Sequence, residues 1–133
     1  MTILKLTSST ILGGFAMWIT AGLWHNLILP SLNHNIEAHH KGLGLMLLAY
    51  LILAFLMTIV YSFKLKTSKP VVEGIKVGMI IGILWVFPHG LAMAGAHDTS
   101  ITYEIKNAIY HMFEQGLGGI VIAYIQSYNA IKK

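Results

Sequence analysis

The sequence lacks cysteine entirely and has very little charge. Only 11% of its 133 residues are Asp, Glu, Lys or Arg, whereas a soluble domain carries about 25%. Hydrophobic residues make up 56% of the chain and the mean hydropathy is +0.68. So few charges cannot cover the surface of a soluble protein, so a membrane protein is expected. The absence of cysteine excludes disulfide frameworks, iron–sulfur clusters, thiolate zinc sites and cysteine nucleophiles.

Several functional motifs are also missing. The sequence has no glycine-rich phosphate loop after a strand and no serine nucleophile elbow. It has no basic surface interleaved with aromatics, which argues against a nucleic-acid partner. These absences favour a protein that is not an enzyme. At this length a single domain is expected.

Four apolar runs reach the length of about 20 residues that an α-helix needs to cross a bilayer. They cover residues 10–29, 43–63, 71–96 and 101–128. The connections are short, which makes sequential helices antiparallel neighbours. The sequence therefore predicts an all-α, integral membrane four-helix bundle of up-down-up-down topology, in one transmembrane domain (1–133) in contact with lipid.

The lysines predict the orientation. Seven of them fall on the side of the two termini and the middle connection: Lys5, Lys64, Lys66, Lys69, Lys76, Lys132 and Lys133. Only Lys41 and Lys106 fall on the other side. The positive-inside rule then places both termini in the cytoplasm and the chain in an inner (plasma) membrane of bacterial type.

All seven histidines fall in the outer half of this topology: His25, His34, His39, His40, His89, His97 and His111. Four of the five acidic residues join them there: Glu37, Asp98, Glu104 and Glu114. At a rise of 1.5 Å per residue, Glu114 lies ~18 Å below the outer boundary, near the bilayer midplane. Ionisable groups at that depth normally face the bundle interior or water. We therefore expect an outer-half His/Glu pocket.

The pocket has the residue types of a metal or haem site. Imidazole and carboxylate suit Zn, Cu or Fe, and thioether selects Cu(I). One candidate metal site combines His89, His111 and Glu114, with His25 nearby. Alternative ligands are the line His89, Met93 and His97 on one helix face, and the Glu-x-x-His pair Glu37 and His40. His89 and His111 are also at similar depth, as the two axial ligands of a non-covalent haem b would be.

Two other interpretations remain open. Intramembrane His and Glu chains are common in proton relays or metal-dependent membrane enzymes. Alternatively, these side chains are hydrogen-bonding groups of a purely structural subunit. The glycines at 74, 78 and 82 form a small-residue face, which predicts association with a second copy or with a larger membrane complex.

The chain resembles an uncharacterised family of small four-span bacterial membrane proteins. The resemblance lies in the stretch from Gly14 to Asn26 and in the Glu73-Gly74 start of a glycine-spaced span that has Pro88 near its outer end. It continues in the final span between residues 105 and 123. The resemblance implies four spans and carries no activity.

Overall fold

The computed structural model describes residues 2–28, 42–63, 69–97 and 100–131, and nearly all of them are helical. Helix α1 covers Ile3–Leu23 and continues as a π-helical turn, η1, over Trp24–Ile28. Helices α3 (Leu43–Ser62), α4 (Pro70–His97) and α5 (Ile101–Ile131) follow. The predicted all-α antiparallel four-helix bundle is confirmed. The first helix begins seven residues before the predicted span because the Thr2 hydroxyl caps it, accepting from the Lys5 amide at 3.3 Å.

Within the described residues, three helical segments are long and apolar enough to cross a membrane. These are Ile3–Ile28, Leu43–Ser62 and Pro70–His97. The protein is thus a small multi-pass membrane protein. Helix α5 does not meet the same criterion, because polar residues such as Glu114, Gln115 and Gln126 lower its mean hydropathy. Its interior polar residues are covered by the other helices: Glu114, Gln115, Gln126 and Ser127 are all buried.

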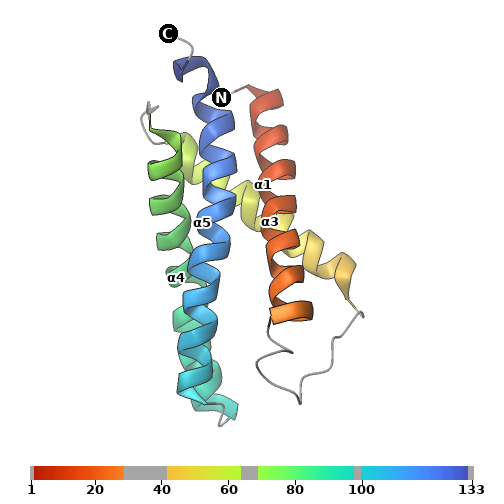
Figure 1. The fold of residues 1–133 in the computed structure, drawn as a ribbon, viewed down its shortest axis with the longest axis vertical. Coiled ribbons are helices and arrows are strands. Elements are labelled where there is room, and N and C mark those ends of the chain that lie inside the picture. Colours follow the sequence, from red (N-terminus) through yellow and green to blue (C-terminus); the bar gives the residue numbers. More distant parts are fainter. Residues whose placement is uncertain (1, 29–41, 64–68, 98–99, 132–133) are drawn as a thin grey trace.

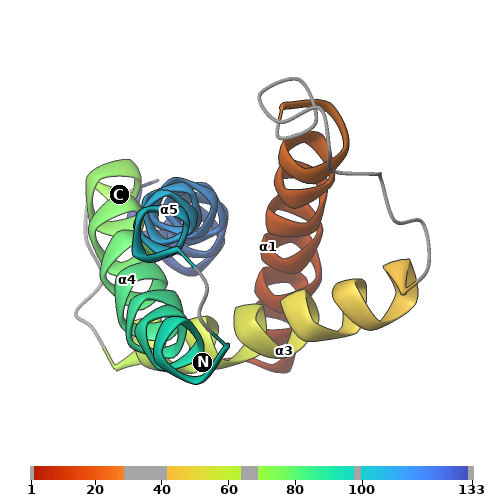
Figure 2. The same cartoon turned by 90° about the horizontal axis from the view of Figure 1, so that it is seen from below.

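The helices are not packed as a symmetric square. Helices α4 and α5 share the most extensive contact, and α1 packs against both α3 and α5. Helix α3 crosses behind α5 and α1 at a steep angle (Figure 1), and the perpendicular view shows it lying across α1 (Figure 2). Close approach at this crossing depends on Gly14, where an added Cβ would lie 3.3 Å from the Tyr50 carbonyl oxygen. Tyr50 is thereby held against α1.

Helices α1 and α5 pack antiparallel in a regular register. The α1 face consists of buried residues four apart: Ser9, Gly13, Met17 and Ala21. Ser9 meets Gln126, Gly13 meets Ile122, and Met17 meets Gly118. Each step of four residues along α1 is matched by a step of four back along α5. This register sets Ala21 level with Glu114, the next residue of the α5 face.

The face of glycines 74, 78 and 82 is occupied within the chain. A Cβ at Gly74 would lie 2.5 Å from the Gly119 carbonyl oxygen, and one at Gly82 would lie 2.8 Å from the His111 carbonyl oxygen. At Gly78 the Cβ would collide with the Gln115 carbonyl. The prediction that this face binds another subunit is therefore wrong: it holds α4 against α5. The close packing follows from the missing side chains, which let the two backbones touch.

The apolar core lies between α1, α3 and α5. Its buried residues are Met17, Ala54, Met57, Tyr61, Ile122 and Ala123. On α5, Glu114 lies about two turns before Ile122 of this core, and Gln126 lies about one turn after it. The core thus separates two polar regions of the bundle.

The polar contact between α1 and α5 makes a small, measurable contribution to stability. The Gln126 side-chain amide donates to the Ser9 hydroxyl at 3.0 Å, and both residues are buried. We expect Ser9→Ala to lower the free energy of unfolding by about 0.6 kcal/mol, the average for interhelical hydrogen bonds in membranes. Ser8→Ala is the matched control, since the Ser8 hydroxyl donates to Leu4 within its own helix. Equal effects of the two variants on unfolding in mixed micelles would contradict the assignment.

Candidate functional site

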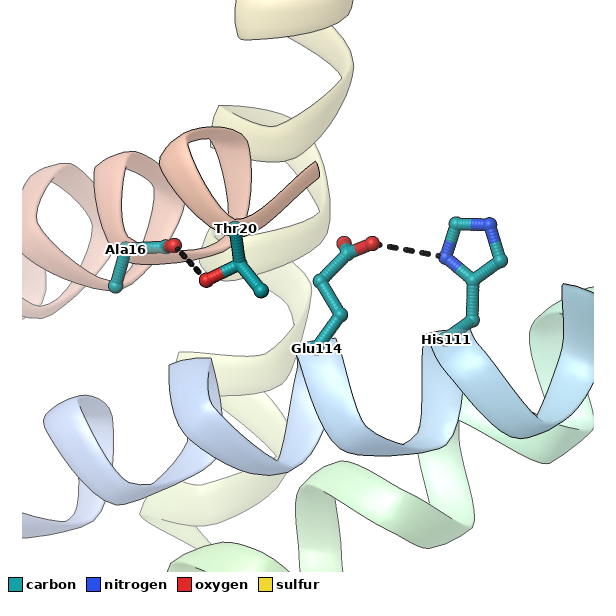
Figure 3. A network of polar contacts seen from close by, with 4 residues as sticks. All are labelled: Ala16, Thr20, His111 and Glu114. Atoms are coloured by element: carbon teal, nitrogen blue, oxygen red, sulfur yellow. Dashed lines mark hydrogen bonds and ion pairs between the residues drawn. The ribbon is translucent and has the colours of Figure 1, made fainter. Parts of the chain in front are cut away.

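Glu114 is the most deeply enclosed ionisable residue of the described structure. Its side chain has no exposed area, and its Oε2 lies 3.1 Å from Nδ1 of His111, whose side chain is 16% exposed. Both residues stand on α5, three positions apart, so helical geometry brings them together. Figure 3 shows the Glu114 carboxylate directed toward the His111 ring. The contact has ion-pair distance but lacks hydrogen-bond geometry. The Tyr50 and Tyr110 hydroxyls lie within hydrogen-bonding range of Glu114, but no hydrogen bond of full geometry reaches either Glu114 oxygen among the described atoms.

Side chains from three other positions surround this pair. The hydroxyls of Tyr50 on α3 and Tyr110 on α5 interact electrostatically with the Glu114 carboxylate. His25 of η1 interacts with both His111 and Glu114. Glu114 is therefore faced by two phenols and two imidazoles.

An aromatic group closes one end of the site. Trp24 stacks on Tyr110, with ring centroids 4.3 Å apart and planes 11° apart. Tyr110 also meets His25 edge-on at 6.1 Å and His111 at 5.2 Å. We call Trp24, His25 and Tyr110 the aromatic end of the bundle. The π-helical turn at Trp24–Ile28 supplies two of its members, and such turns are frequent at functional sites.

Helix α1 contributes little to balancing the negative charge of the Glu114 carboxylate. Figure 3 shows Thr20 projecting from α1 on the side of α5, but its hydroxyl donates to the Ala16 carbonyl of its own helix at 2.8 Å. The residue of α1 level with Glu114 in the helix register is Ala21, which is apolar and fully buried. The charge of Glu114 must therefore be balanced by the imidazoles of His111 and His25 or by a proton.

This arrangement can hold and exchange a proton. A buried ionised carboxylate is costly unless it is paired. With one imidazole beside it, the pair is neutral either as imidazolium and carboxylate or as imidazole and carboxylic acid. Passage between the two forms moves one proton over a short distance without creating net charge.

The structure does not bring all the sequence-predicted ligands together. His111 and Glu114 are adjacent, and His25 lies close by. His89, Met93 and His97 are exposed on α4, whose glycine face packs against α5. Glu37 and His40 lie outside the described residues.

In the part of the chain that the structure describes, no group of three His, Asp or Glu side chains is arranged to hold a metal ion. The two proposed axial haem ligands differ in environment, since His89 is exposed and His111 is partly buried. The copper, zinc, iron and haem b hypotheses stay predictions.

Sequence reasoning missed three residues of the site: Tyr50, Tyr110 and Trp24. For Tyr110 a signal existed, because it precedes Glu114 by four residues and so shares its helix face. Trp24 adjoins His25 in the sequence, but that adjacency alone does not indicate its stacking on Tyr110. For Tyr50 no signal existed, because its position depends on where α3 crosses α1.

Comparison with known proteins adds no assignment. No protein-family model, curated protein or solved structure matches this chain. The resemblance to the uncharacterised four-span family stays a prediction.

Proposed function

We propose that this membrane protein takes up and releases a proton at the His111–Glu114 pair, as a relay site inside the bundle. The observation that carries this proposal is the Glu114 carboxylate: it has no exposed area, it has an imidazole nitrogen at 3.1 Å, and the hydroxyls of Tyr50 and Tyr110 lie within its hydrogen-bonding range. Intramembrane ionisable residues are costly and are typical of proton paths.

The surroundings support a proton as the exchanged species. The groups facing Glu114 are Tyr50, Tyr110, His25 and His111, and each of them can donate and accept protons. A metal would need three ligands in place, and among the described residues no group of three His, Asp or Glu side chains is arranged to hold one. In the orientation that the lysines predict, the aromatic end faces the outside, and His25 and Tyr110 lie between that end and Glu114.

The fourth crossing of the membrane is part of this proposal. Helix α5 carries the pair, and we propose that it spans the bilayer despite its charges, because its deep polar groups face the bundle interior. A purely structural role for the pair is the competing interpretation. The two interpretations differ in one respect: a purely structural His111–Glu114 pair need not change its protonation state.

Infrared spectroscopy of the purified protein tests the proposal. We expect a carboxylic-acid C=O band that appears on acidification, shifts in D2O and vanishes in Glu114→Gln. Glu73→Gln is the control, because Glu73 is a partly exposed acid 3.7 Å from Lys76. A spectrum in which Glu114→Gln removes no titrating band across the accessible pH range would refute proton exchange and favour the structural role.

A further inference from the structure

A second polar cluster lies at the other end of the bundle, where α1 begins and α5 ends. The Lys5 ammonium donates to the Gln126 carbonyl at 2.9 Å, and the Gln126 side chain donates to Ser9 at 3.0 Å. Ser127 on α5 is fully buried and Tyr61 on α3 is 4% exposed. We call these five residues the terminal end.

Two hydroxyls of the terminal end resemble Glu114 in one respect. The Tyr61 hydroxyl and the Ser127 hydroxyl are buried and have no hydrogen-bond partner within the described protein. Buried polar atoms in proteins are almost always satisfied, often by internal water that makes about three hydrogen bonds. We therefore expect internal water beside each of these hydroxyls.

An apolar layer separates the two polar regions. Gln126 follows Glu114 by twelve positions on α5, which is ~18 Å along the helix axis. Over that length Met17 of α1 packs on Gly118, Ile122 of α5 packs on Gly13, and Met57 of α3 belongs to the same buried cluster. These three large side chains are each at most 1% exposed. We call Met17, Met57 and Ile122 the plug.

We infer that the terminal end is a second proton-exchange site and that the plug is the barrier between it and Glu114. The bundle then contains a proton-exchange site on each side of the plug, and the plug closes the path for protons between them. The inference rests on the proposed function for its first site. The path is closed because protons need water or polar groups to move, and the plug offers neither.

Met17 is the movable part of the plug. A methionine has three rotatable side-chain bonds beyond its backbone and adapts to irregular space. Its side chain lies directly over Gly118, where an added Cβ would be 2.5 Å from the Met17 Cγ. Because Gly118 presents no side chain, a rotation of Met17 opens space one helical turn from Glu114.

Proton flux into vesicles tests this inference. The full-length protein is reconstituted with a trapped pH-sensitive dye, and a potassium diffusion potential drives proton entry. We expect Met17→Ser to raise the flux by about tenfold, which needs the barrier to fall by only about 1.4 kcal/mol. The increase should vanish in Met17→Ser/Glu114→Gln and should shrink when Tyr61→Phe and Ser127→Ala are added. Leu91→Ser, on the exposed face of α4, is the control and should leave the flux unchanged.

The results separate this inference from the proposed function. A titrating Glu114 band together with an unchanged flux in monodisperse Met17→Ser would overturn the path and leave the relay site standing. A flux increase that persists without Glu114 would also overturn it, because the leak would then bypass the site. If Met17→Ser is not monodisperse, Met57→Ala opens the same layer from α3 and carries the same expectations. The conservative pair Tyr61→Phe and Ser127→Ala adds a second test, since it must lower any flux that the wild type shows.

Discussion

Replacing Gly78 with alanine is expected to lower the free energy of unfolding by about 1–3 kcal/mol, the usual cost of overfilling a packed interface. The new methyl group would meet the Gln115 carbonyl and the Gly116 backbone of α5. Backbone atoms cannot rotate away as a flexible side chain can. The two helices must therefore move apart, and every contact along their shared face weakens with them.

Gly95→Ala on the same helix is the matched control. Gly95 is exposed, and a Cβ there would meet nothing within 4 Å. Its replacement should raise stability by about 0.5–1 kcal/mol, because alanine is the better helix former. Unfolding in mixed micelles, followed by circular dichroism, measures both variants. If both changed stability in the same direction, the α4–α5 backbone contact described here would be wrong.

Replacing His111 with leucine should cost up to about 3–5 kcal/mol at a pH where Glu114 is ionised, because it leaves a buried carboxylate without its partner. The cost should fall as the pH is lowered, because a protonated carboxyl needs no counter-charge. Tyr50, Tyr110 and His25 remain beside Glu114 in this variant and set how far the cost falls.

The double variant His111→Leu/Glu114→Leu provides the decisive comparison. Replacing both members of a buried pair with apolar residues is often neutral or stabilising. We therefore expect the double variant to recover most of the stability lost by His111→Leu while losing the titrating carboxyl band. A double variant as unstable as the single one would show that the pair serves the fold.

The sequence was sufficient to predict the helices because their signal is local. Runs of apolar residues at bilayer length depend only on neighbouring positions, and the helix bounds followed with few changes. The His111–Glu114 contact was also accessible, since both residues lie on one face of one helix. Contacts between helices were harder to predict. The glycine stripe around Gly78 indicates close packing but does not indicate with which helix, and we expected another subunit.

The same difficulty affected His89. Its depth matched that of His111, yet depth along a helix says nothing about rotation around the helix axis. The rotation of α4 is set by its glycines, which bury one face against α5 and leave His89 exposed. The position of Tyr50 depends on the angle at which α3 crosses α1 at Gly14. No sequence pattern within α3 indicates that angle.

The uneven polarity of the helices has a consequence for how the protein is made. The segments Ile3–Ile28, Leu43–Ser62 and Pro70–His97 are apolar enough to enter a membrane one at a time as they are synthesised. Helix α5 is synthesised after them, and it carries the buried Glu114, Gln115 and Gln126. Its interior-facing groups meet no partner until α1, α3 and α4 are in place. Biogenesis should therefore end with the insertion of α5 against a preformed surface, and a chain truncated before residue 101 should still integrate but not complete its core.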